Sequence, residues 1–188
     1  MAIKSTVLKA TLQIADMDRY YYADHALTLA LHPSETEERM MVRLLAFALY
    51  ASDSLVFAQG ISGEEEPDLW QKNLTGAIER WIVVGLPDER IIRKACGRAG
   101  EVVIVSYGRT ADIWWNDNRS KFARLNNLTV LRLPADATLA LAKLASRTMQ
   151  LQCTIQEGSL MFSCDQGVVQ IEPELRHGSL PSGKSWQQ

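Results

Sequence analysis

The chain has 188 residues, of which 47% are apolar, and this is enough for one continuous core. Basic residues number 20 against 22 acidic ones, so no global field attracts polyanions and any contact with nucleic acid must be local. Three widely spaced cysteines without a C-x-x-C pair argue against a disulfide framework or a zinc site. With no signal-peptide pattern and no apolar run of membrane-span length, we expect a soluble, cytoplasmic protein and no membrane partner.

Strand and helix signals alternate along the first part of the chain. A helix is expected where Ser34 and Glu37 have the spacing of a capping box. The apolar patterns and turn signals predict, in chain order, a hairpin of strands 3–15 and 20–31, a helix 34–51, a short strand 56–59, and a strand that begins at Asp68 after an acidic turn at 63–67.

The strongest strand signal lies at 78–84, where both parities are apolar, as expected for a strand covered on both faces. The following pattern predicts a helix 88–98 that begins at Asp88 and is closed by Gly100, a strand 102–107, a helix 112–125, a strand 130–133, a helix 136–150 and a meander of strands 151–156, 159–163 and 168–171. Periodicity is lost after Pro173. We therefore expect one α/β domain, residues 1–175, with a mixed central sheet flanked by helices, and a flexible tail at 176–188.

Two carboxylates could meet in an apolar setting. Glu79 lies within the 78–84 strand, and an antiparallel pairing could bring Asp68 beside it. Converging carboxylates repel each other unless a proton or a hard cation lies between them, and Mg²⁺ is the usual occupant. A solvated surface pair of Glu79 with Arg80 is an equally good interpretation from the sequence alone.

Charged residues on two helices could join this pair. Glu38 falls in line with the apolar residues of its helix, so it either stabilises the helix start or points inward as a site residue. Lys94 and Arg98 stand four apart and therefore share one side of their helix. Their charges could neutralise the carboxylates or bind a phosphate, or this side of the helix could simply be solvated.

Several blocks of the sequence together resemble the YaeQ family of bacterial proteins. They are Ser34-Glu-Thr-Glu-Glu-Arg-Met-Met, Pro67-Asp-Leu-Trp-Gln-Lys, Ile78-Glu-Arg-Trp-Ile-Val-Val-Gly-Leu-Pro-Asp-Glu and Lys94-Ala-Cys-Gly-Arg-Ala. This family is regarded as a divergent branch of the PD-(D/E)XK nuclease-like fold. The resemblance implies a restriction-endonuclease-like core, with an N-terminal hairpin and a C-terminal β meander, and Mg²⁺-dependent hydrolysis of phosphodiesters.

The resemblance also implies roles for particular residues. Asp68 stands at the "PD" place and Glu79 at the "(D/E)" place, which would make them metal ligands, and Glu38 matches an acidic residue of the first core helix. Trp81 replaces the lysine expected two residues after Glu79, so Lys94 is the residue placed to act as its substitute, with Lys72 a weaker one. Substrate contacts would fall to the remaining polar and aromatic residues nearby, namely Arg98, Trp81 and Gln71.

Two functions are therefore open. The first is a Mg²⁺-dependent nuclease or phosphodiesterase with a variant site. The second is a non-catalytic module that keeps the fold and binds a protein or a nucleic acid; Trp81 at the lysine place favours it. A surface for such binding is indicated by Trp114 and Trp115, which precede Arg119, Lys121 and Arg124. We expect one of the two tryptophans in the core and the other at its rim.

Overall fold

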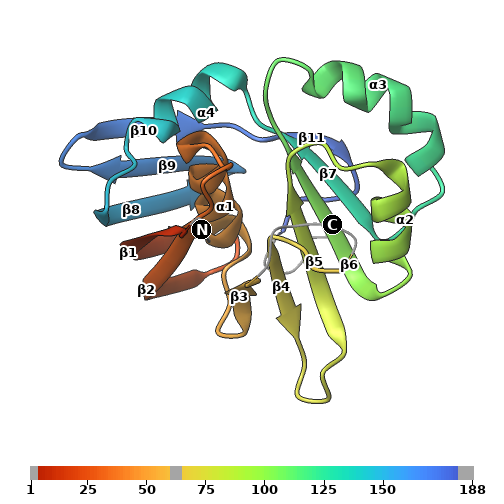
Figure 1. The fold of residues 1–188 in the computed structure, drawn as a ribbon, viewed down its shortest axis with the longest axis horizontal. Helices are drawn as coiled ribbons and strands as arrows, with labels where there is room; N and C mark the ends of the chain where they lie inside the picture. The colour runs from red at the N-terminus through yellow and green to blue at the C-terminus, as the bar shows by residue number, and fades with distance from the viewer. Residues whose placement is uncertain (1–3, 60–64, 182–188) are drawn as a thin grey trace.

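A computed structural model describes residues 4–59 and 65–181 of the chain (Figure 1). Its elements are, in order, β1 (Thr6–Asp16), β2 (Tyr21–Leu31), α1 (Glu37–Tyr50), β3 (Leu55–Phe57), β4 (Leu69–Lys72), β5 (Ile78–Val84), α2 (Glu89–Cys96), β6 (Ala99–Ser106), α3 (Ala111–Phe122), β7 (Leu128–Arg132), α4 (Ala135–Ala142), β8 (Thr148–Gln156), β9 (Ser159–Cys164), β10 (Gly167–Ile171) and β11 (Glu174–His177). Strands and helices alternate through its middle, which confirms the expected α/β class with helices flanking mixed sheets.

The expected hairpin and meander form one sheet rather than two separate elaborations. Its strand order is β10-β9-β8-β1-β2, and β1 joins the hairpin to the meander by running parallel to β8. Buried and exposed residues alternate along β1 and β8, as in a sheet with one face packed and one face in water. The sequence predicts both pieces because they are local, but their pairing joins segments more than a hundred residues apart.

The central strands form a second, six-stranded sheet of order β11-β7-β6-β5-β4-β3. Strands β5, β6 and β7 run parallel, with α2 and α3 as their crossover helices, and β4 pairs antiparallel with β5. The last four residues of β5 are all buried, as expected from its apolar pattern on both parities. One face of β5 packs toward α1, and the other toward α2 and α3.

Helix α1 occupies the space between the two sheets (Figure 1). Every residue from Met40 to Tyr50 is buried, so even its charged Arg43 is enclosed. The larger core therefore joins α1 to residues of both sheets, with Phe47, Ile82 and Leu151 as examples. A helix covered on all sides needs its polar groups paired, because an unpaired buried charge would cost several kcal/mol (about 3–5).

Several helix ends differ from the expected ones. Thr36, not Ser34, caps α1 by accepting a hydrogen bond from the Arg39 amide, so the predicted capping box is wrong. Asp88 caps α2 as expected, since its side chain accepts from the Arg90 amide, but α2 is closed by Gly97. The chain reaches Gly100 only inside β6, where a side chain would press against the backbone of Glu79.

The C-terminal part is more regular than expected. The helix predicted for 136–150 stops at Ala142, and β8 starts at Thr148. Periodicity ends after Pro173, yet Glu174–His177 forms β11 and pairs with β7 at the edge of the second sheet. Of the predicted tail 176–188, residues 182–188 lie outside the described part of the chain, as do Gly63 and Glu64 of the acidic turn.

Candidate functional site

Asp68 lies at the entry to β4, where its buried carboxylate is held by two donors. One carboxylate oxygen, Oδ1, accepts a hydrogen bond of 2.8 Å from Arg39 Nη2, and Oδ2 accepts one of 2.7 Å from the Val84 amide. Burial raises the pKa of Asp68 above its ordinary value, although the Arg39 guanidinium and the Val84 amide both lower it. Asp68, just before β4, thus connects the β4–β5 hairpin to α1.

The strand opposite Asp68 offers no second carboxylate. The Asp68 amide donates to the Ile82 carbonyl, and Leu69 is paired with Ile82 across the ladder. The residues of β5 at this level are therefore Ile82, Val83 and Val84, all buried and apolar.

Glu79 lies near the opposite end of β5 and is exposed to water. Its Oε2 accepts a 2.9 Å hydrogen bond from Gln71, and the strand register places it beside the end of β4 rather than its start. Val84 lies five residues after Glu79 along the strand, which is a distance of about 16 Å. The expectation that antiparallel pairing brings Asp68 and Glu79 together is therefore wrong.

Glu38 points to a third place in the fold. Its Oε1 accepts a 2.8 Å hydrogen bond from the hydroxyl of Thr138 on α4, and that threonine is fully buried. Glu38 is half-buried and belongs to the α1–α4 contact. Of the two alternatives for Glu38, the structure shows the side chain turned toward α4, where it bonds a threonine and not another acidic residue.

Lys94 and Arg98 stand together on the far side of β5 from α1. Both form ion pairs with the exposed Glu65, and Lys94 also hydrogen-bonds to it. The Arg98 guanidinium lies 5.1 Å from the ring centre of Trp81, which is fully buried and meets Trp70 edge-on. Trp81 is one of the residues expected to contact a substrate, but in this structure no part of its ring is exposed.

The remaining predicted residues belong to the β4–β5 hairpin. Gln71 accepts a 3.1 Å hydrogen bond from Ser52 and donates to Glu79, so both ends of its amide are used. Lys72 lies with its ammonium 3.5 Å from the ring centre of Trp70. These contacts are those of a strand pair held by its own side chains.

The predicted site residues thus occupy separate places and do not fit a divalent cation held by two carboxylates. Within residues 4–59 and 65–181, no group of three or more His, Cys, Asp or Glu side chains is placed to hold a metal ion. The roles of Glu38, Asp68, Glu79 and Lys94 in catalysis stay predictions, and no chemical step through Mg²⁺ follows from this geometry.

A charged network around Asp68 was not predicted. Glu35 accepts hydrogen bonds from Arg39 (2.9 Å) and from Arg43 (2.8 Å), and Arg43 also reaches the Ala30 carbonyl of β2. These residues, with Asp68, line a cavity of about 350 Å³. The sequence held a signal for this network, because Glu35, Arg39 and Arg43 are spaced by four. Arg39 and Arg43 share one face of α1, and Glu35 lies just before the cap of that helix.

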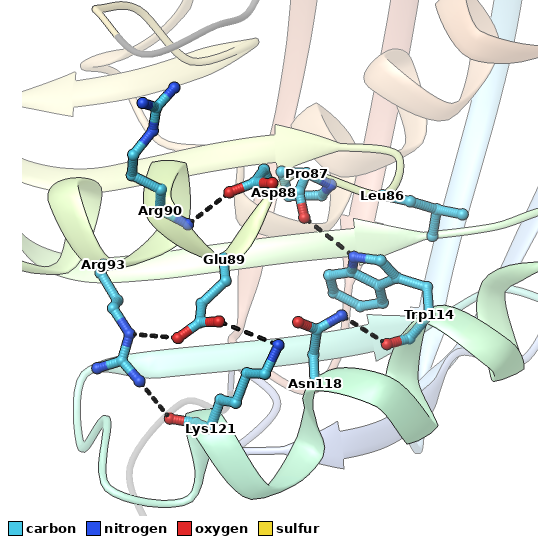
Figure 2. Close-up of a pocket in the computed structure, with 9 residues that line it drawn as sticks. All are labelled: Leu86, Pro87, Asp88, Glu89, Arg90, Arg93, Trp114, Asn118 and Lys121. Carbon is cyan, nitrogen blue, oxygen red and sulfur yellow. Dashed lines mark hydrogen bonds and ion pairs between the residues drawn. The ribbon is translucent and has the colours of Figure 1, made fainter.

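A larger cavity of about 550 Å³ lies between the start of α2 and the side of α3 (Figure 2). Arg90, Arg93 and Lys121 line it together with Trp114 and Asn118. We call this the α2–α3 cavity.

The Glu89 carboxylate forms two ion pairs with cations that line the α2–α3 cavity. Glu89 accepts from Arg93 Nε at 2.7 Å and lies 3.1 Å from Lys121 Nζ, and Arg93 also donates to the Lys121 carbonyl. Both cations lower the pKa of Glu89. Glu89 thus joins α2 to α3. It also pairs with Arg93 and Lys121, the cations that would otherwise bind an anion in the cavity.

Trp114 presents its ring rather than its N–H group to the α2–α3 cavity. Its Nε1 donates a 2.9 Å hydrogen bond to the Pro87 carbonyl (Figure 2), and its ring centre lies 5.9 Å from that of Phe122. Trp115 also packs against Phe122, and both tryptophans are half-buried. The expectation of one tryptophan in the core and one at the rim is therefore wrong.

Two mixed sheets wrapped around a buried helix define a two-sheet α/β protein. None of its described helices is long and apolar enough to cross a membrane. Comparison with known proteins shows that residues 1–173 match the model of the family described as "YaeQ protein". The chain therefore belongs to the YaeQ family.

Relatives and solved structures agree with this assignment. The chain is 47% identical to "Uncharacterized protein YaeQ" of Salmonella typhi, over 92% of this chain and 96% of the relative. Identity to the protein of the same name in Escherichia coli K12 is 46%, over 91% and 95% of the two chains. The crystal structure of YaeQ from Xanthomonas axonopodis pv. citri matches with a TM-score of 0.90 at 48% identity, over 93% and 99% of the chains. That of YaeQ from Pseudomonas syringae matches with a TM-score of 0.89 at 34% identity, over 93% and 97%.

Proposed function

We propose that this YaeQ-family chain is a non-catalytic binding module, and that its ligand is single-stranded nucleic acid held at the α2–α3 cavity. The observation that carries the proposal is the composition of that cavity, in which Trp114 lies among Arg90, Arg93 and Lys121. Cationic side chains contact phosphates, and an aromatic face stacks on a base whatever its identity.

The local charge supports this ligand. Residues 88–98 carry four basic and two acidic side chains, and residues 111–125 carry three basic and two acidic ones, whereas the whole chain has a net charge of −2. Positive charge is therefore concentrated on α2, α3 and the residues next to them. A single strand is favoured over a duplex because its bases are free to stack, and Trp114 has only ring surface left to offer.

Mg²⁺-dependent cleavage is the weaker proposal. It retains Asp68 at the place that the family resemblance implies, but the carboxylates of Glu38 and Glu79 are bound elsewhere. The Asp68 carboxylate already accepts hydrogen bonds from Arg39 and from the Val84 amide. A metal ligand here would have to give up both partners inside a buried setting.

Fluorescence anisotropy with a labelled single-stranded oligonucleotide tests the proposal. We expect Lys121→Ala and Arg93→Ala each to weaken binding about threefold to tenfold, the range of a lost phosphate contact at moderate salt. Arg147→Ala is the matched control, because this arginine lies between α4 and β8, outside the cavity. Binding that is absent, or that falls equally in the control, contradicts the proposal. Selective capture of an acidic peptide instead of the oligonucleotide would assign the cavity to a protein partner.

A further inference from the structure

The outer face of the five-stranded sheet is open to water. In the described part of the chain, α1 and α4 contact this sheet from its inner side, where β1 and β8 bury alternate residues (Figure 1). The strand register aligns the outward residues in rows, and one such row runs Ala26, Thr11, Gln150 from β2 through β1 to β8.

This outer face is poor in charge although the chain is not. Along all five strands its outward positions are mainly Thr, Gln, Ala and Ser, and Lys9 and Asp24 are the only charged side chains among them. Depletion of charge is the compositional mark of a protein–protein interface. Larger apolar side chains project from it: Tyr22 and Met161 are 62% and 44% exposed.

We propose that this outer face is an interface between two copies of the chain, related by a two-fold axis that lies between the two faces and runs along the row of Ala26, Thr11 and Gln150. A two-fold interface must be complementary to itself, because the same surface appears on both sides. The charges and shape of this face meet that condition.

The two charged residues complement each other under this two-fold axis. Along β2, the axis places Asp24 of one copy over Thr28 of the other, and Lys9 is paired with Thr28 in the sheet. Each copy thus brings Asp24 next to the partner copy's Lys9, and the pair occurs twice.

The shape and the area of the outer face also fit a two-fold interface. A hollow of about 260 Å³ lies between β2, β1 and β8. Small side chains such as Thr11, Ala26 and Thr28 line it together with the longer Lys9, Leu27 and Met149. The same axis directs Tyr22 of one copy toward Ala30 of the other, at the hollow's end of the face. Five strands of up to 11 residues present about 700 Å² of face, close to the roughly 800 Å² per partner of a standard interface.

Analytical ultracentrifugation of the full chain tests the dimer. We expect a species of twice 21.1 kDa at concentrations up to about 100 µM, since interfaces of this size reach micromolar affinity or better. Gln150→Glu places two carboxylates face to face on the axis and should raise the dissociation constant at least about tenfold. Gln166→Glu, the same change in the β9–β10 turn, should leave it unchanged.

A charge exchange tests the pairing itself. Asp24→Lys and Lys9→Asp should each weaken the dimer, while the double exchange should restore it to within about threefold of wild type. If the chain is a monomer at every concentration, the proposal is overturned, and the outer face would then be expected to bind a different protein. A dimer that is insensitive to Gln150→Glu, or that the double exchange does not restore, overturns it as well.

Discussion

Buried Asp68 and half-buried Arg39 form an ion pair that connects the start of β4 to α1, with Oδ1 and Nη2 2.8 Å apart. The same arginine also bonds Glu35 and the Val84 carbonyl, so one guanidinium holds the helix, the hairpin and the next strand together. Burial correspondingly disfavours the charge on Asp68, while Arg39 and the Val84 amide favour it, and the first effect is the larger. Asp68 therefore has a structural role that does not depend on catalysis.

The raised pKa of Asp68 predicts how stability depends on pH. Its ordinary value is 3.8, and the folded protein binds the proton more tightly than the unfolded chain does. Its contribution to stability is therefore fully present below the ordinary pKa and is lost as pH rises through the raised one. The free energy of unfolding of wild type, minus that of Asp68→Asn, should be larger near pH 4 than near pH 7. Urea unfolding of both proteins at the two pH values measures this difference in the free energy of unfolding. A difference of opposite sign would mean that pairing with Arg39 outweighs burial.

The hydrogen bond between Thr138 and Glu38 should stabilise the α1–α4 contact. Thr138→Val keeps the shape but removes the hydroxyl, and we expect it to lower the free energy of unfolding by about 1.5–3 kcal/mol, the range for hydrogen bonds to charged groups. Urea denaturation checks the value. Glu38→Gln is the matched variant: its amide oxygen still accepts the bond, so it should cost less. Equal losses in the two variants would contradict this assignment.

The thiol of Cys96 should be unreactive in the folded protein. Burial raises its pKa to about 11 from the ordinary 9.0, against the smaller opposing effect of Arg93. Two pKa units correspond to about a hundredfold lower thiolate fraction at neutral pH, and alkylation should slow accordingly. Site-resolved mass spectrometry after a timed iodoacetamide pulse, with the urea-unfolded chain as reference, gives the ratio. Equal folded and unfolded rates would show that the basic helix face, not burial, controls this cysteine.

Glu89 should limit the affinity of the α2–α3 cavity for phosphate. Its carboxylate pairs with both Arg93 and Lys121, so Glu89→Gln releases two cations to the ligand. We expect oligonucleotide binding to tighten about threefold to tenfold, more strongly at low salt. Anisotropy titrations measure the change, and Asp165→Asn, which removes a carboxylate from the distant β9–β10 turn, corrects for net charge. A gain of the same size in both variants would place binding elsewhere.

Local signals predicted local structure well. Asp88 marks the start of α2 because a cap needs only its own next two residues, and the meander follows from turns at Glu157-Gly158 and Asp165-Gln166. The β1–β8 pairing was not predictable in this way, because nothing in either strand specifies a partner so far along the chain.

The position of Glu79 was missed although a signal for it existed. Asn73 accepts hydrogen bonds from the amides of Thr75 and Ala77, and Gly76 has a φ of 85°, so the turn of this hairpin is built from Asn73 to Ala77. A turn centred there places Asp68 opposite residues near 83 and Glu79 beside the end of β4. The separation of the two carboxylates is thus a consequence of the turn's place in the sequence.

One incubation tests binding without cleavage most directly. An end-labelled single-stranded oligonucleotide is mixed with the protein and Mg²⁺, its anisotropy is recorded, and its length is then read on a denaturing gel. The predicted result is saturable binding that Lys121→Ala weakens, with the oligonucleotide intact. Shortened products that require Mg²⁺ and disappear in both Asp68→Asn and Glu79→Gln would contradict it.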